Sequence, residues 1–199
     1  MSIRAVKTTL NEIDNRVLEK EILEQSRTVD ESYIKDEFAT HYTYYEDTPY
    51  SFGQPESEKL IQVLESKVSE LTKRDMEVVD IWSVVLHPGQ SVGAHSHKLN
   101  THHYPEEYYS VAYYVKADED SADFIFMLTA CNTLEKNVSV KVSTGELLVF
   151  NSYLLHMTNR HMGKTNRIVV SANLAPKVPS SLVAQDWSLH SVKENRNSK

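Results

Sequence analysis

Several short segments rich in β-branched and aromatic residues follow one another over residues 76–174, and this succession limits the fold more than any other feature. They read MEVVDIWSVVLH, EYYSVAYYVKA, DFIFMLTA, VSVKVST, GELLVFN and RIVVSANL, and such segments predict β-strands. Two longer segments before them, residues 11–25 and 56–73, carry apolar residues at helical spacing and predict amphipathic helices. The order predicts an α+β chain, with helices packed against one side of an antiparallel barrel or sandwich.

The two predicted helices have their own start signals and apolar stripes. Thr9 and Glu12 have the spacing of a capping box before the first helix, and Pro55 stands in the first turn of the second. The stripes comprise Leu10, Ile13, Val17, Leu18 and Ile22 in the first helix and Leu60, Ile61, Leu64, Val68 and Leu71 in the second. We expect both helices to be structural, with Ile13, Val17 and Leu64 facing the barrel.

The length of 199 residues favours a single domain over residues 1–199. Within it we expect a helical buttress over residues 9–73, a strand-rich core over residues 76–174 and a C-terminal extension over residues 175–199. The sequence leaves the oligomeric state open.

Charge and cysteine content narrow the setting of the protein. The net charge of −7 argues against binding nucleic acid by bulk charge. Cys131 is the single cysteine, so an internal disulfide is excluded and a reducing compartment fits. The first residues lack the apolar core of a signal peptide, and no apolar run approaches the ~18 residues of a membrane span. We therefore expect a cytoplasmic protein that does not enter the membrane.

The stretch GQSVGAHSHK places two histidines one residue apart. On a β-strand His95 and His97 would point the same way, roughly 7 Å apart, which suits two ligands of one metal ion and also suits a solvated face. His156 ends the apolar run TGELLVFNSYLLH and could supply a third nitrogen from a separate strand. Each histidine alone has an ordinary structural explanation, so the metal-site prediction depends on the joint pattern.

Arg167 opens a strand whose other residues are apolar or small, eleven residues after His156. An unpaired buried charge is very costly, so such an arginine needs an anionic partner. The intervening HMGKTN contains no acid. The carboxylate of a bound ligand, held by the two-pronged guanidinium, would satisfy this requirement.

The segments HSH, YYSVAYYV, TGELLVFNSYLLHMTN and RIVVSANL resemble the core of iron(II)- and 2-oxoglutarate-dependent oxygenases. The resemblance is strongest to small bacterial and phage-borne members with an HxH-containing motif, and it covers residues 78–174. It implies a double-stranded β-helix, or jelly roll, with the N-terminal helices as a buttress. It also implies Fe(2+) and 2-oxoglutarate as cofactors.

Carried over residue by residue, the resemblance implies that His95 is the first metal ligand and His156 the distal one. It implies that Arg167 binds the far carboxylate of 2-oxoglutarate. No catalytic residue is implied beyond the metal site. Further candidates for cofactor binding are Ser171 and Asn173, which share a strand face with Arg167 by alternation, and Tyr113.

One position departs from the family pattern. The usual carboxylate two residues after the first histidine is His97 in this chain. His97 could bind as a third imidazole, Glu106 or Glu107 could bind instead, or the position could be vacant and the site inactive. We expect the first of these, with His95, His97 and His156 as the metal ligands.

A rival family also begins with a similar pattern. Gly89 followed by His95 and His97 matches the start of the first cupin motif, but no proline precedes Gly145, and His156 comes eleven residues after that glycine. The expected function is a dioxygenase, dependent on iron(II) and 2-oxoglutarate, that hydroxylates an unidentified small-molecule or peptide substrate. The alternatives are a cupin-type dioxygenase or isomerase without 2-oxoglutarate, and a non-catalytic jelly-roll binding module.

Overall fold

The computed structural model describes residues 5–25, 41–44, 54–97, 108–130 and 133–177. The two helices are α1 (Asn15–Gln25) and α2 (Pro55–Thr72). The strands are β1 (Ala5–Thr9), β2 (His41–Tyr44), β3 (Met76–Leu86), β4 (Tyr109–Lys116), β5 (Phe124–Ala130), β6 (Thr133–Val140), β7 (Glu146–Asn151), β8 (His156–Thr158) and β9 (Arg167–Pro176). Neither helix is long and apolar enough to cross a membrane.

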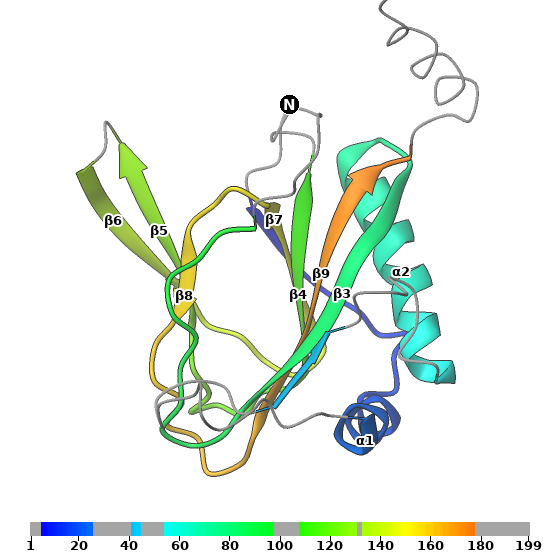
Figure 1. The fold of residues 1–199 in the computed structure, drawn as a ribbon, viewed down its shortest axis with the longest axis horizontal. Coiled ribbons are helices and arrows are strands. Elements are labelled where there is room, and N and C mark those ends of the chain that lie inside the picture. The colour runs from blue at the N-terminus through cyan, green and yellow to red at the C-terminus, as the bar shows by residue number, and fades with distance from the viewer. Residues whose placement is uncertain (1–4, 26–40, 45–53, 98–107, 131–132, 178–199) are drawn as a thin grey trace, which may run out of the picture.

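The strands form two antiparallel sheets that face each other (Figure 1). The large sheet has the order β1-β7-β4-β9-β3-β2, and the small sheet has the order β6-β5-β8. Both helices lie against the face of the large sheet that points away from the small sheet (Figure 1). The predicted α+β class, with antiparallel sheets and two N-terminal helices against one of them, is therefore confirmed.

The central strands of the large sheet, β7, β4 and β9, are buried on both faces, so the two sides of the sheet build two apolar cores. Along β4, Val111, Tyr113 and Val115 point toward the helices, while Ala112 and Tyr114 point toward the small sheet. The helix-side core includes Leu18, Ile22, Leu60, Leu64, Val68, Val149 and Val170. The core between the sheets includes Phe124, Phe126, Leu148, Phe150 and Val169. The second core is where the functional candidates gather.

The start of the first helix differs from the sequence prediction. Thr9 pairs with Glu146 in β1, so its backbone is extended and the predicted capping box is wrong. Asp14 caps α1 instead, because its Oδ1 accepts the backbone N–H groups of Arg16 at 3.0 Å and Val17 at 3.3 Å. Val17 is exposed whereas Leu18 and Ile22 are buried, so the prediction that Val17 faces the barrel is also wrong.

A buried carboxylate joins the two helices. Glu21 of α1 accepts hydrogen bonds at the N-terminus of α2 from the backbone N–H groups of Glu56 at 3.0 Å and Ser57 at 2.9 Å. The Ser57 hydroxyl donates a third hydrogen bond to it at 2.7 Å. These bonds satisfy backbone donors that a helix leaves open at its start. They also fix α2 against α1.

Leu64 and Val17 give a matched test of the helix orientation. Leu64 is 0% exposed in the helix-side core, whereas Val17 is 44% exposed. We expect Leu64→Ala to lower the free energy of unfolding by about 2–5 kcal/mol because it leaves a cavity. Val17→Ala should change it by less than about 0.5 kcal/mol. Chemical denaturation measures both, and equal losses would contradict the assigned helix faces.

Candidate metal and cofactor site

Three histidines from two distant segments of the chain meet between the two sheets. His95 and His156 form an antiparallel bridge, each donating its backbone N–H to the other's carbonyl oxygen at 2.9 Å. The backbone N–H of His97 donates to the carbonyl oxygen of Ser152 at 2.9 Å. One ring nitrogen from each of the three histidines lies within 4.8 Å of the others. The local backbone therefore brings the three predicted histidines into one cluster.

Hydrogen bonds assign the ring nitrogens of two of these histidines. Nδ1 of His95 lies 2.8 Å from the carbonyl oxygen of Gly93, and Nδ1 of His156 lies 2.8 Å from that of Leu154. A carbonyl oxygen only accepts, so each Nδ1 carries the proton and each Nε2 keeps a free lone pair. Such an outer partner is typical of histidines that bind metals.

Burial keeps His97 and His156 uncharged. Desolvation lowers the pKa of His156 to about 3 and that of His97 to about 4. His156 is 4% exposed and stacks on the ring of Phe124, with centroids 5.0 Å apart. A metal ligand must be the neutral imidazole, so both rings are ready to bind at neutral pH. Three neutral nitrogen donors suit a divalent transition metal such as iron(II).

The same pKa values predict acid sensitivity of the metal-free protein. His97 and His156 bind protons more readily when unfolded, where the pKa is near 6.5, than when folded. The free energy of unfolding should therefore fall as the pH drops below about 6.5, by at most about 1.4 kcal/mol per pH unit for each histidine. Denaturation between about pH 6.5 and 5 measures this, above most carboxylate titrations. Replacing both histidines by glutamine should flatten the curve, and an unchanged slope would contradict the burial argument.

Arg167 lies deep in the same region without a carboxylate partner. It is 2% exposed, and its Nε has no hydrogen-bond partner among the described residues. In the described part of the chain no carboxylate oxygen lies within 4 Å of the guanidinium. Desolvation lowers its pKa from the usual value, although an arginine remains charged at any ordinary pH. A buried cation of this kind fits an anionic ligand.

Tyr114 is the neighbour of Arg167 inside the protein. The guanidinium carbon lies 4.9 Å from the centre of the Tyr114 ring, which contributes a cation–π contact. Burial raises the pKa of Tyr114 to about 12, so its hydroxyl stays protonated. Arg167 and Tyr114 can therefore offer several N–H and O–H donors to one anion.

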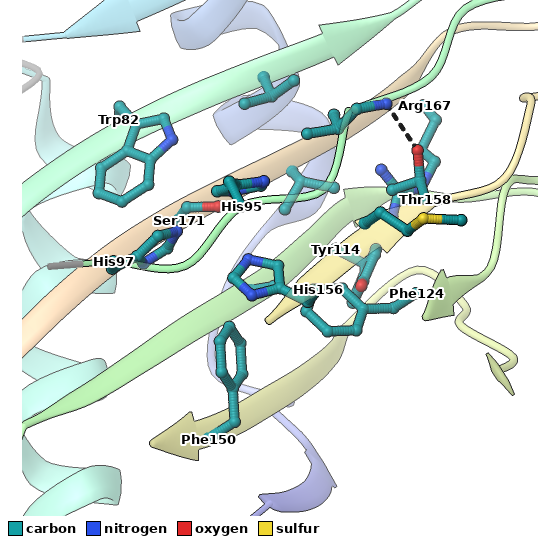
Figure 2. A pocket seen from close by; sticks show the side chains of 15 residues that line it. Trp82, His95, His97, Tyr114, Phe124, Phe150, His156, Thr158, Arg167 and Ser171 are labelled. Carbon is teal, nitrogen blue, oxygen red and sulfur yellow. Dashed lines mark hydrogen bonds between the residues drawn. The ribbon is translucent and has the colours of Figure 1, made fainter. Parts of the chain in front are cut away.

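One pocket joins the histidine cluster to Arg167 (Figure 2). Figure 2 shows Trp82 and His97 on one side of this pocket and Arg167 with Thr158 on the other. The pocket contains about 480 Å³ of empty space, part of it open to solvent. Aromatic and aliphatic side chains complete its wall: Val84, Val92, Ala112, Phe124, Phe150, Met157 and Val169.

Residues 80–173 match the model of a family described as putative 2OG-Fe(II) oxygenase. This match confirms the predicted resemblance to the iron(II)- and 2-oxoglutarate-dependent oxygenases. The predicted family, its enzyme class and its cofactors, iron(II) and 2-oxoglutarate, are thereby confirmed. No curated protein matches the sequence significantly.

Solved structures of oxygenases share the fold. The α-ketoglutarate-dependent carbocyclase SnoK from nogalamycin biosynthesis is 13% identical with a TM-score of 0.65, and the match covers 88% of this chain and 80% of SnoK. HygX from Streptomyces hygroscopicus, with nickel and 2-oxoglutarate bound, is 12% identical with a TM-score of 0.63, over 88% and 84% of the two chains. A prolyl-4-hydroxylase from Pseudomonas putida is 12% identical with a TM-score of 0.59, over 87% and 93%. At such identities the likeness concerns the fold.

The predicted site residues of this oxygenase divide into those that line the pocket and those that do not. His95, His97, His156, Arg167 and Ser171 all line it. Tyr113 and Asn173 do not line it.

Tyr113 is a wrong prediction. Its hydroxyl donates to Asn15 Oδ1 at 2.8 Å in the helix-side core, because successive residues of β4 point to opposite faces. Tyr114 is the tyrosine that lines the pocket. The sequence hides this choice, since β4 is buried on both faces and shows no polar side. Trp82, Phe124 and Phe150 were missed for the same reason, because buried aromatic residues have the same appearance in a core and in a pocket wall.

Asn173 contacts a histidine and is not among the residues that line the pocket, so its predicted role in cofactor binding stays a prediction. Its Oδ1 lies 2.8 Å from Nδ1 of His97, on the far side of the ring from the unengaged nitrogen. Glu106 and Glu107, the alternative ligands, lie outside the described residues. Among the described residues, the group of side chains that could hold a metal ion consists of the three histidines.

Proposed function

We propose that this oxygenase hydroxylates a small-molecule or peptide substrate, using iron(II) bound by His95, His97 and His156. Arg167 binds the far carboxylate of 2-oxoglutarate. The observation that carries this proposal is the pocket shared by three clustered imidazoles and a buried guanidinium that has no carboxylate partner among the described residues. When bound, iron(II) and 2-oxoglutarate supply the oxidation of an unactivated C–H bond by molecular oxygen.

The three imidazoles set the charge of the site. Because they are neutral, they leave the whole charge of a divalent ion uncompensated, whereas the common carboxylate ligand would cancel part of it. The attraction to dianionic 2-oxoglutarate is correspondingly stronger, since charges interact strongly in a dry site. The low pKa values of His97 and His156 support this assignment, because protons do not compete with the metal at neutral pH.

Arg167 and Tyr114 orient the cosubstrate in this proposal. A guanidinium can donate two parallel hydrogen bonds to one carboxylate, which fixes both its position and its direction. The protonated hydroxyl of Tyr114 offers a further donor beside it. A carboxylate placed there would satisfy the open Nε of Arg167 and relieve the cost of the buried charge.

The aromatic wall excludes water from the reacting end of the pocket. Phe150 and Phe124 both pack on His156, with ring centroids 4.9 Å and 5.0 Å apart. A water-poor pocket strengthens each polar contact and protects reactive species from side reactions. Trp82 contacts His97 edge-on, with centroids 5.2 Å apart, and forms the part of the wall available to a substrate.

We also propose a small-molecule substrate and a cytoplasmic location for this oxygenase. A HygX structure contains hygromycin B with nickel and 2-oxoglutarate, which supports a small molecule as the substrate here. The single cysteine supports a cytoplasmic location. We further infer one domain, in which residues 9–73 buttress a catalytic core over residues 76–174 and residues 175–199 form an extension.

Turnover without substrate tests the reaction class. Oxygenases of this kind are expected to convert 2-oxoglutarate slowly to succinate even when no substrate is present. We expect succinate to form when the protein is supplied with iron(II), 2-oxoglutarate and oxygen, and the His156→Ala variant to form none. An iron-loaded wild-type protein that leaves 2-oxoglutarate intact would favour the cupin-type reading.

A further inference from the structure

Three polar residues form a row across the middle of the large sheet. Asn173 of β9 pairs in register with Asp80 of β3 on one side and with Ser110 of β4 on the other. An irregularity in the β3–β9 pairing between Val78 and Asp80 sets this register. The three side chains therefore share the face of the sheet that carries the pocket.

Hydrogen bonds run along this row to His97. Asn173 Nδ2 donates to Asp80 Oδ2 at 3.3 Å. Asn173 Oδ1 lies 2.7 Å from Ser110 Oγ and 2.8 Å from His97 Nδ1. Ser110 Oγ also lies 2.8 Å from His97 Nδ1 and 2.9 Å from Ser152 Oγ, and its one proton can be donated to only one of these neighbours. Asn173 and Ser110 are both buried.

The chemistry of these groups determines which of them donate and which accept along the row of hydrogen bonds. An ionised carboxylate only accepts hydrogen bonds, so Asp80 requires the amide nitrogen of Asn173 on its side. The amide oxygen then faces His97, and an oxygen there requires a proton on Nδ1. Ser110 cannot impose this choice, because a hydroxyl both donates and accepts. Only in the pair of Asp80 and Asn173 are the donor and the acceptor roles fixed.

We propose that Asp80 and Asn173 are positioning residues that hold His97 in the tautomer with Nδ1 protonated and Nε2 free for the metal. This inference rests on the proposed function. In His95 and His156 the same tautomer is fixed by a hydrogen bond from Nδ1 to the carbonyl oxygen of the residue two positions earlier. A carboxylate ligand at position 97 would have no tautomer to fix. A histidine ligand does, and the hydrogen bonds of Asp80 and Asn173 fix it.

The tautomer of His97 in the metal-free protein is the direct readout. Nitrogen-15 NMR of labelled histidine separates protonated from unprotonated ring nitrogens. We expect wild type and Ser110→Ala to show His97 with Nδ1 protonated. The double variant Ser110→Ala/Asn173→Leu, which lacks both acceptors, should shift His97 toward the Nε2-protonated form. Its iron(II) affinity should be about 10–100-fold lower than that of Ser110→Ala.

A double variant that exchanges Asp80 and Asn173 should preserve the tautomer of His97. Asp80→Asn/Asn173→Asp exchanges the two side chains and keeps an acceptor facing His97 with a donor behind it. We expect this variant to retain the wild-type tautomer and an iron(II) affinity close to wild type. If it lost both as completely as the leucine double variant does, the polarity of the row would not set the tautomer and the proposal would fail.

Two further outcomes separate this proposal from neighbouring explanations. If the leucine double variant lost thermal stability but kept Nδ1 of His97 protonated, Asn173 would be merely structural and the proposal would be overturned. A wild-type protein that binds no iron(II) would overturn the proposed function. A tautomer shift in the double variant would even then support the role of Asp80 and Asn173 toward His97.

Discussion

Replacing His156 by alanine should lower iron(II) affinity by more than about 100-fold, beyond the loss expected from removing only an outer partner of a ligand. His156 supplies one of three nitrogens that lie within 4.8 Å of one another. Its loss leaves too few ligands to hold the ion. Metal titration by calorimetry measures the affinity, and chemical denaturation checks that the variant is folded. His87→Ala is the matched control, because His87 pairs with Asn166 and does not line the pocket.

The same titration decides the identity of the third ligand. We expect His97→Ala to weaken iron(II) binding strongly and both Glu106→Gln and Glu107→Gln to change it little. His97→Asp restores the common carboxylate and should retain part of the binding. If a glutamate variant lost the metal while His97→Ala kept it, the third ligand would lie in the segment after His97. If His156→Ala kept the wild-type affinity for iron(II), the assignment of the histidine cluster as the metal site would be contradicted.

Arg167→Met should raise the dissociation constant for 2-oxoglutarate while leaving iron(II) affinity nearly unchanged. A buried charge-assisted contact is worth about 2–5 kcal/mol, which corresponds to roughly 30- to 4,000-fold in the dissociation constant. Arg167→Lys should fall between wild type and Arg167→Met, because it keeps the charge but loses the two-pronged geometry. Lys164→Met is the control, since it removes an exposed positive charge from the segment just before β9.

The same substitution should raise the stability of the ligand-free protein. Arg167 carries a buried charge with no carboxylate within 4 Å among the described residues, so an apolar side chain of similar length removes a desolvation cost. Thermal unfolding without ligand should therefore occur at a higher temperature in Arg167→Met than in wild type. An unchanged requirement for 2-oxoglutarate would exclude Arg167 from the cosubstrate site.

The sequence was sufficient for features that depend on periodicity or spacing. The strands and the helix stripes follow from residue alternation, and the positions of His95, His156 and Arg167 follow from strand ends and a family resemblance. Each of these signals is local, so tertiary contacts do not alter it. The small strand β8 and the N-terminal strand β1 were not predicted, because only pairing with distant strands makes such short segments extended.

The sequence was insufficient to decide which face of a strand or helix points toward the pocket and which points toward the core or the solvent. Tyr113 and Tyr114 are adjacent and both fully buried, and only the packing of the helices decides which one reaches the pocket. Val17 was assigned to the apolar stripe of the first helix but is exposed, because Leu18 and Ile22 are the residues that face the core. Asn173 has the strand face that was predicted, yet His97 intervenes between it and the pocket.

Anaerobic titration of the wild-type protein, first with iron(II) and then with 2-oxoglutarate, tests the central claim most directly. The claim is that three histidines and Arg167 together bind both cofactors in one pocket. We expect iron(II) to bind, and the weak visible charge-transfer band of the iron and 2-oxoglutarate chelate to appear when the second ligand is added. Iron(II) binding without that band would contradict the proposed cosubstrate site, and the absence of iron(II) binding would contradict the metal site itself.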